Sequence, residues 1–427
     1  MDRFFGISAQ GSTVRTELMA GLTTFLTMAY ILLVNPTILG EAGMDRGAVF
    51  VATCLASAFG SAAMALYANY PLALAPGMGL NAYFTYAVVI GMHQPWQVAL
   101  GAVFVSGLLF LALSVSRLRE LIINGIPRSQ KLAISAGIGL FLGLLAFKNA
   151  GITVTSPETL VTLGDIASPG ALLAALGFIL MVALDARRVP GAIMIAILAV
   201  TALGVAFGLT PFGGIAALPP SLAPTFLQMD LRGTMELGVA TIIFAFFFVD
   251  LFDSTGTLIG VAHRAGLMRP DGTIPRLGRV LICDSLAILV GAALGTSTVT
   301  SYIESAAGVK AGGRTGLTAL TVAILFLASL LLAPLASSVP AYATAPALLF
   351  VACLMARGLA EVDWEDVTDY APAVVTALAM PLTFSIANGL SLGFISYAAI
   401  KLLAGRNPGP TMSILAVLFL LRYAVIG

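Results

Sequence analysis

The sequence predicts an all-α membrane protein with many transmembrane segments. Of its 427 residues, 59% are hydrophobic and only 10% carry a charge. Apolar runs of roughly twenty residues, which is the length of a membrane-spanning helix, recur from one end of the chain to the other. These runs are apolar on every face, so they do not match the alternating apolar and polar pattern of a closed β-barrel.

The apolar segments follow a short polar N-terminus, residues 1–17. It lacks the charged, apolar and small-residue order of a cleaved signal peptide, so we expect the first span to insert and to remain in the protein. The segments lie near 18–36, 47–68, 76–91, 96–116, 129–147, 170–185, 189–208, 234–256, 278–294, 298–309, 315–335, 342–358, 372–388, 389–404 and 411–426. Several are too short to span a bilayer alone, and we expect about fourteen transmembrane segments. The last two segments could form one span and a surface helix.

The basic residues predict how the chain is oriented. If the N-terminus lies inside, one side of the membrane receives Arg3, Arg15, Arg117, Arg119, Arg128, Lys131, Arg187, Arg188, Arg264, Arg269, Arg276, Arg279, Lys310, Arg314 and Arg357. Before residue 400, only Arg46, Lys148 and Arg232 fall on the opposite side. The positive-inside rule therefore predicts a cytoplasmic N-terminus for a multi-pass protein of the plasma membrane.

Several kinds of partner and cofactor are not expected. The net charge is only +1, and no basic patch is interleaved with aromatic residues, so we expect no nucleic-acid binding. The cysteines, Cys54, Cys283 and Cys353, lie far apart in apolar segments, and His93 and His263 are isolated. The sequence therefore predicts neither a disulfide framework, nor a metal site, nor a cofactor.

The longest polar connection, Leu209 to Arg232, is rich in Pro and Gly and divides the chain into halves with about seven segments each. We therefore expect a first repeat over residues 1–210, an extracellular or periplasmic connection over 211–233, and a second repeat over 234–427. An odd number of spans in each repeat would invert one repeat relative to the other.

The third segment of each half is short and contains residues that break helices. These stretches are Pro71–Asn81 in the first half and Gly295–Glu304 in the second. Interrupted segments at matching positions of two halves indicate the central binding site of a transporter. A helix that begins within the membrane leaves its first N–H groups unpaired, and those groups can form a polar cradle. The hydroxyls of Thr296–Ser301 could cap the second half-helix. A close contact of small residues is the structural alternative.

Two acids, Asp250 and Asp253, end a phenylalanine-rich run that starts at Thr241. Their spacing places both on one helical face, and one could hold a proton while the other is charged. A carboxylate at membrane depth is costly unless it is paired, protonated or facing water, so the pair indicates a functional site. Simple solvation near the cytoplasmic end remains open for Asp253.

Other polar residues are candidates of different strength. Glu304 lies one turn into its short segment, with no basic neighbour nearer than Lys310. Asn81 can donate and accept hydrogen bonds at once, although buried asparagines often only cap the backbone. A ring of the phenylalanine run could stack on a flat ligand, although packing is the simpler interpretation. We interpret Asp185 and Asp284 as structural and the acidic stretch 361–369 as a solvated loop.

Five stretches together carry a resemblance to a known family. They are Gly21–Pro36, Ala75–Ala82, Phe247–Leu258, Thr296–Gly308 and Met380–Ala387. In this order they resemble the AzgA-like purine permeases, a branch of the nucleobase:cation symporter-2 (nucleobase–ascorbate transporter) family, over nearly the whole chain. The alignment of segment boundaries is least defined at the C-terminus.

The resemblance implies two inverted seven-segment repeats that form a core domain, about 18–116 plus 234–335, and a gate domain, about 128–208 plus 340–427. It implies import of hypoxanthine, guanine or adenine by symport with H⁺, rather than Na⁺, through alternating access. The expected setting is the bacterial inner membrane, with the lipid bilayer and a second copy of the chain, as a homodimer, for partners. The alternatives are an anion transporter of the sulfate or bicarbonate type with the same fold, and a uracil- or xanthine-type symporter.

The resemblance also assigns roles to residues, none of them catalytic, since no enzyme activity is expected. It places Asp250, Glu304 and Asn81 in the substrate-binding set, to which we add Thr27 and Phe247. The residues expected to couple protons or to support the site are Asp253, Glu304, Thr300 and Ser301. Hydrogen-bonding chemistry agrees with these assignments, because a carboxylate can accept hydrogen bonds from the N–H groups along a purine edge.

Overall fold

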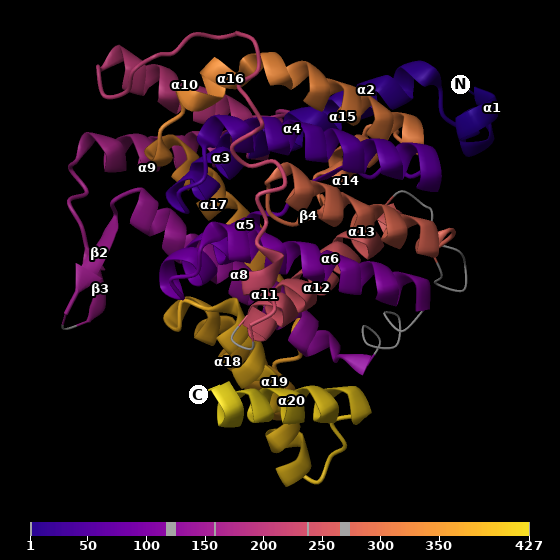
Figure 1. The fold of residues 1–427 in the computed structure, drawn as a ribbon, viewed down its shortest axis with the longest axis vertical. Helices are drawn as coiled ribbons and strands as arrows, with labels where there is room; N and C mark the ends of the chain where they lie inside the picture. Colours follow the sequence, from indigo (N-terminus) through magenta and orange to yellow (C-terminus); the bar gives the residue numbers. More distant parts are fainter. Residues whose placement is uncertain (1, 117–124, 158, 237–238, 265–273, 427) are drawn as a thin grey trace.

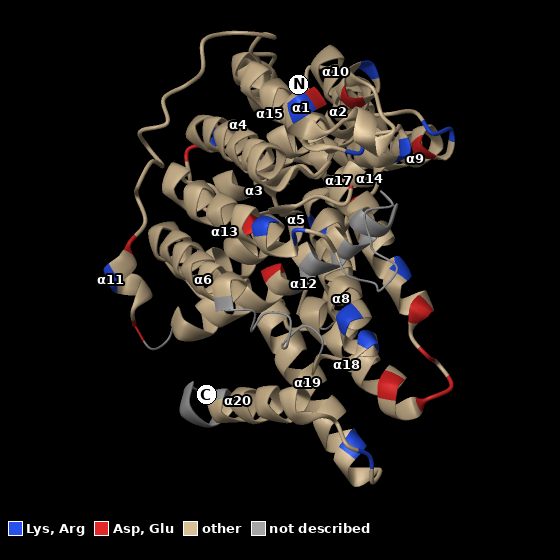
Figure 2. Cartoon of the chain, turned by 90° about the vertical axis from the view of Figure 1, so that its right-hand side faces the viewer, with Lys and Arg blue, Asp and Glu red and all other residues tan. Residues whose placement is uncertain are grey.

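The structure is a computed structural model that describes residues 2–426 except 117–124, 158, 237–238 and 265–273. The described chain is almost entirely helical (Figure 1). Within the described residues, nine helices are long and apolar enough to cross a membrane, and shorter apolar helices accompany them. Charged side chains are sparse along the helices and gather at helix ends and loops (Figure 2). The prediction of a polytopic helical membrane protein is therefore confirmed.

The first half of the chain contains α1 (Asp2–Phe5), η1 (Ser8–Gln10), α2 (Val14–Met28), α3 (Ile31–Glu41), α4 (Arg46–Ala63), η2 (Met64–Ala68), β1 (Leu74–Pro76), α5 (Met78–Ala82), η3 (Tyr83–Gly91), α6 (Trp96–Ser116), α8 (Arg128–Asn149), β2 (Thr153–Ser156), β3 (Leu160–Leu163), α9 (Pro169–Ala186) and α10 (Ala192–Ala206). The second half contains α11 (Leu231–Thr234), α12 (Ala240–Arg264), α13 (Leu277–Leu294), β4 (Val299–Ser301), α14 (Ser305–Lys310), α15 (Gly316–Ala328), η5 (Ser329–Leu332), α16 (Ala333–Ser337), α17 (Ala341–Ala356), η6 (Arg357–Glu361), α18 (Val367–Leu382), α19 (Ile386–Leu403) and α20 (Pro410–Ile426).

Polar residues at the helix starts explain where several helices begin. Asp45 accepts a hydrogen bond from the backbone N–H of Ala48 at 2.7 Å and so caps α4. Thr13 caps α2 and Ser385 caps α19 in the same way. Each cap satisfies one of the N–H groups that a helix leaves unpaired at its first turn.

The helices pack in two groups. One group contains α2, α4, α6, α13 and α15, and the other contains α8, α9, α10, α17, α18 and α19. Helix α12 contacts both groups, because it packs against α6, β4 and α14 as well as against α8 and α19. The residues of the phenylalanine run therefore lie between the two groups.

The two interrupted segments meet in a two-stranded antiparallel sheet. Strands β1 and β4 pair with Ala75 opposite Thr300. Beyond the strands, the N–H of Gly77 donates to the carbonyl of Thr298 at 2.9 Å, and the N–H of Tyr302 donates to the carbonyl of Ala73 at 3.0 Å. The short helices α5 and α14 begin directly after these strands. The predicted helix breaks are therefore present at the expected places.

The predicted capping of the second half-helix is wrong. Helix α14 has Glu304 at its cap position, without a side-chain capping bond, and the hydroxyls of residues 296–301 do not reach it. Glu304 accordingly stands at the helix start rather than one turn into the helix. The physical reason is that β4 is extended, so its side chains alternate between the two faces of the sheet and bond to neighbouring helices instead.

A second pair of short strands was not predicted. Strands β2 and β3 form an antiparallel hairpin between α8 and α9, with Thr153 opposite Leu163 (Figure 1). Each strand has only four residues. Such a short hairpin gives little periodic signal beside the apolar helices that flank it.

The acidic stretch 361–369 does more than contact solvent. Asp366 caps α18, and Asp366 and Asp369 hold the buried Lys401 of α19 at 3.6 and 3.2 Å. Hydrogen bonding from the Thr368 hydroxyl is the main cause that lowers the pKa of Asp366 to about 2. The interpretation of this stretch as a merely solvated loop is therefore wrong: two of its acids join the start of α18 to the end of α19.

Gly308 determines how closely α14 approaches α2, and its substitution provides a test of the fold. A Cβ at Gly308 would lie 2.0 Å from Thr24 Oγ1 and 2.6 Å from the Ala20 carbonyl. We expect Gly308→Ala to lower the free energy of unfolding by about 1–3 kcal/mol, because such overpacking forces the backbone to shift. Thermal unfolding in detergent measures this loss. Gly278→Ala in α13 is the matched control, because nothing lies within 4 Å of that Cβ; equal melting temperatures for the two variants would contradict the prediction.

Candidate functional site

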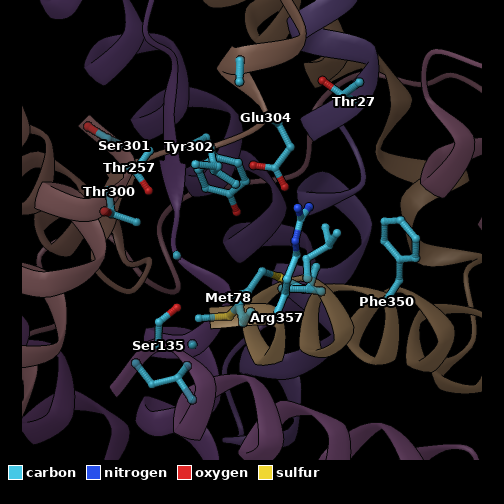
Figure 3. Close-up of a pocket in the computed structure, with 18 of the residues that line it drawn as sticks. Thr27, Met78, Ser135, Thr257, Thr300, Ser301, Tyr302, Glu304, Phe350 and Arg357 are labelled. Carbon is cyan, nitrogen blue, oxygen red and sulfur yellow. The ribbon is translucent and has the colours of Figure 1, made fainter. Parts of the chain in front are cut away.

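A cavity of about 820 Å³ lies beside the paired strands and has a size typical of small-molecule sites. One wall comes from the interrupted segments, including Met78, Thr300 and Glu304, and another comes from α17, including Phe350 (Figure 3). The cavity thus lies between the two groups of helices. Both interrupted segments contribute to its wall, as the sequence predicted for the central site.

Glu304 projects into this cavity (Figure 3). Its Oε1 accepts a hydrogen bond from the hydroxyl of Tyr30 at 2.7 Å. Tyr30 stands at the start of α3, so a side chain of the first half holds the acid of the second half. Because the residue is half-exposed, the carboxylate is available to a ligand or to water.

Asp250 lies one layer behind the cavity wall. The side chain is buried, and its neighbours Val249 and Thr257, rather than Asp250 itself, line the cavity. Ser254 Oγ donates to Asp250 Oδ1 at 3.3 Å and lies 2.7 Å from Thr300 Oγ1. Since a serine hydroxyl has one hydrogen, Thr300 must donate to Ser254, which leaves the Thr300 oxygen as an acceptor on the cavity wall.

Ser301 connects the other face of β4 to a second buried acid. Its hydroxyl donates to Asp284 Oδ1 at 3.2 Å, and Asp284 is only 1% exposed. Sequence reasoning interpreted Asp284 as a structural acid near the cytoplasmic end. Asp284 lies behind a cavity-lining strand because the folded chain packs α13 against β4, a contact that the sequence does not indicate.

Asn81 also lies behind the cavity. It is fully buried, and its Oδ1 accepts a hydrogen bond from Ser297 Oγ. Within the described part of the chain, its Nδ2 has no hydrogen-bond partner. Asn81 therefore joins the two interrupted segments and retains an amide donor for a further partner.

The remaining sequence candidates are distributed differently. Thr27 lines the cavity, but its hydroxyl donates to the carbonyl of Thr24 at 2.8 Å. Phe247 is buried and packs edge to face against Phe110 at 5.6 Å, so it does not line the cavity. The side chain of Asp253 lies outside the described residues. The structure thus gathers Glu304, Thr27, Thr300 and Ser301 at the cavity and places Asp250, Asn81 and Phe247 behind it.

Sequence reasoning missed three aromatic residues of the cavity, Tyr30, Tyr302 and Phe350. The hydroxyl of Tyr302 donates to the carbonyl of Pro76 at 2.6 Å and so fixes its ring beside β1. Tyr30 and Tyr302 lie in stretches that carried the family resemblance, which was the available signal. Phe350 had no signal, because its role depends on the packing of α17 against distant segments.

Charged side chains besides Glu304 also line the cavity. They are Lys131, Asp185, Lys310, Arg357 and Glu361. Glu361 forms an exposed ion pair with Arg128 at 2.7 Å. Among the described residues, no group of three His, Cys, Asp or Glu side chains could hold a metal ion. The arrangement therefore provides a pocket with both hydrogen-bonding and charged groups in its wall.

Known proteins resemble this chain over almost its whole length. It is 50% identical to the putative permease MJ0326 of Methanocaldococcus jannaschii, over 100% of this chain and 99% of that protein. It is 48% identical to the adenine permease AdeP of Escherichia coli, over 100% and 96% of the two chains. It is 45% identical to the guanine/hypoxanthine permease PbuG of Bacillus subtilis, over 99% of each chain.

A solved structure shows where the fold occurs elsewhere. The transmembrane domain of the cyanobacterial bicarbonate transporter BicA matches with a TM-score of 0.68 over 89% of this chain and 97% of that domain. The sequences are only 16% identical, so this likeness concerns the fold alone. The expected membrane transporter fold is confirmed.

Family membership follows from these comparisons. The model of the permease family (Xan_ur_permease) matches residues 15–392. Near full-length relatives at 45–50% identity point the same way. The chain therefore belongs to the permease family, whose members are transporters rather than enzymes.

Proposed function

We propose that this permease imports purine nucleobases, namely hypoxanthine, guanine and adenine. The observation that carries the proposal is the position of Glu304, a carboxylate that faces the cavity from the start of α14 and is fixed by Tyr30. Relatives named adenine permease and guanine/hypoxanthine permease, which match nearly the whole chain, support the choice of substrate.

The chemistry of the cavity fits a purine. A purine is a flat ring system with N–H donors and ring acceptors along its edge, so a carboxyl oxygen of Glu304 can accept a hydrogen bond from one of its N–H groups whether or not the acid carries a proton. The Thr300 oxygen supplies a second acceptor, and Asp250 holds it in place through Ser254. Tyr302 and Phe350 present ring faces or edges to a flat ligand from opposite walls.

We further propose that transport is coupled to H⁺ rather than Na⁺. A neutral purine leaves the charge of the acids uncompensated, so a proton on Glu304 would favour transfer of the loaded carrier through a closed, dry intermediate. Ser301 would support this step by its hydrogen bond to Asp284, and Thr300 would support it by holding Ser254, which donates to Asp250. Asp253 remains a proposed coupling acid on the helix that carries Asp250.

Alternating access requires two bodies that move relative to each other. We propose that residues of about 18–116 and 234–335 form the core domain, and those of about 128–208 and 340–427 the gate domain, which agrees with the two packing groups. In this arrangement the repeats 1–210 and 234–427 are inverted and joined by 211–233. We propose that this conformation faces inward, because Lys131, Lys310 and Arg357, which line the cavity, are among the basic residues that the positive-inside rule assigns to the cytoplasmic side.

The proposed setting is the bacterial inner membrane, with a cytoplasmic N-terminus and a homodimeric assembly. An anion transporter of the bicarbonate type shares the fold, but the acids at and behind the cavity disfavour a bound anion. A uracil- or xanthine-type symporter is the other alternative. In that case the same hydrogen-bonding groups of the cavity would bind a different nucleobase.

Uptake into proteoliposomes tests the substrate and the coupling ion. We expect labelled hypoxanthine, guanine or adenine to accumulate when the outside is acidic, and accumulation to fall to simple equilibration when the pH gradient is collapsed. Uracil and bicarbonate are the comparison substrates in the same vesicles. Preferred uptake of uracil would contradict the purine assignment, and bicarbonate flux without purine uptake would favour the anion alternative.

Glu304→Gln tests the acid that faces the cavity. The change replaces one carboxyl oxygen by an NH₂ group, which donates but cannot accept a hydrogen bond, so we expect purine affinity to fall roughly ten- to a hundredfold. Binding of labelled purine to the purified protein measures this change. Glu365→Gln is the matched control, because Glu365 is exposed and does not line the cavity. Unchanged affinity in Glu304→Gln would remove Glu304 from the binding site.

Ser254→Ala tests whether Asp250 acts through Thr300. The variant removes the hydroxyl between the Asp250 carboxylate and the Thr300 hydroxyl, so Thr300 is no longer oriented as an acceptor. We expect the purine affinity of Ser254→Ala to fall by about three- to tenfold, and that of Asp250→Asn to fall at least as far. Ser396→Ala in α19 is the control, since its hydroxyl donates to its own helix at Gly393. Loss of binding in Asp250→Asn with full binding in Ser254→Ala would instead indicate direct contact between Asp250 and the purine.

A further inference from the structure

Arg357 is a cation of the cavity that the proposed binding scheme does not use. It follows the last residue of α17, begins η6 and is exposed. Its guanidinium extends into the cavity toward the side from which Glu304 projects (Figure 3). Within the described part of the chain, Arg357 forms no ion pair in this conformation.

Arg357 and Glu304 stand on opposite bodies of the molecule. Glu304 belongs to the packing group of α2, α4, α13 and α15 through α14, whereas Arg357 belongs to the group of α8 and α9 through α17. A rearrangement that closes the cavity moves these groups toward each other. The pair can therefore be broken in an open state and formed in a closed one.

The empty carrier creates a need for such a pair. A symporter that has released its substrate and its proton must return with the acid of the site charged. Closing the cavity removes water from Glu304, and a single hydrogen bond from Tyr30 does not neutralise a carboxylate. A cation that approaches only in the closed state would offset this cost.

The other charged groups at the cavity are less suited to approach Glu304 as a countercharge in the closed state. Lys310 lies on α14 with Glu304 and moves together with it. Lys131 stands in the first turn of α8 and is half-buried there. Asp185 is an acid, and Glu361 is an acid already paired with Arg128. Arginine also presents a planar fork that matches a carboxylate at two points.

We propose that Arg357 pairs with Glu304 in the closed, empty carrier and so permits its return without substrate. Substrate and proton replace this ion pair in the loaded carrier, because the protonated acid no longer needs a countercharge. Arg357 is thus a positioning residue of the transport cycle rather than a binding residue for the purine. The inference rests on the proposed proton symport.

Two transport modes separate this role from a structural one. Exchange of internal for external purine uses only the loaded carrier, whereas net uptake also needs the empty carrier to return. In proteoliposomes, we expect Arg357→Gln to keep purine exchange within about twofold of the unmodified protein. We expect its net uptake, driven by a pH gradient, to fall about tenfold or more, because the charged site now crosses without its partner.

Two control variants define the result. Arg357→Lys keeps the positive charge and should restore much of the net uptake. Lys310→Gln removes another cation of the same cavity and should leave the ratio of net uptake to exchange unchanged. If Arg357→Gln loses exchange and net uptake equally, or retains both, the inference is wrong.

The same vesicles distinguish a failure of this inference from a failure of the proposed function. If the unmodified protein shows no purine accumulation that depends on the pH gradient, the proposed symport fails and the variants have no bearing on it. If that accumulation is present and Arg357→Gln matches it, the symport stands and Arg357 has no part in the return step.

Discussion

The pairing of β1 with β4 is the constraint on which the site depends. In a bilayer every backbone N–H and C=O must find a partner inside the protein, so a helix cannot be interrupted there without a substitute. The two breaks supply this substitute to each other, since Leu74, Ala75 and Pro76 lie opposite Ser301, Thr300 and Val299. Because each break satisfies the other, neither half of the chain can build the site alone.

The extended form of β4 explains why buried acids surround it. Successive side chains of a strand point to opposite faces, so Thr300 and Ser301 turn toward different helices. Thr300 reaches Asp250 of α12 through Ser254, and Ser301 reaches Asp284 of α13. In a helix, these hydroxyls could instead have bonded to carbonyls of their own helix. Strand β4 thus forms side-chain hydrogen bonds to two helices, α12 and α13, from its two faces.

Local chemistry made part of this site predictable from the sequence. Gly and Pro break helices wherever they fall, so Pro71–Asn81 and Gly295–Glu304 were recognisable as the interruptions, and a lone acid such as Glu304 is conspicuous in an apolar segment. The remaining features depend on contacts across the chain. The strand pair joins residues more than two hundred positions apart, and Phe247 is indistinguishable in sequence from a phenylalanine that faces a ligand. Tyr30 can donate to Glu304 only because folding brings the start of α3 next to the start of α14.

The fold by itself does not select the substrate. The transmembrane domain of a bicarbonate transporter shares this fold at only 16% identity, so the fold alone does not identify the transported compound. The N–H groups at the start of a half-helix attract negative charge, and a site that uses them unopposed binds anions. Here Glu304 occupies the cap position of α14, and its carboxylate lines the cavity without a capping bond to those N–H groups. Under the proposed function, an external anion would meet repulsion from that carboxylate, whereas a ligand with N–H donors would meet an acceptor.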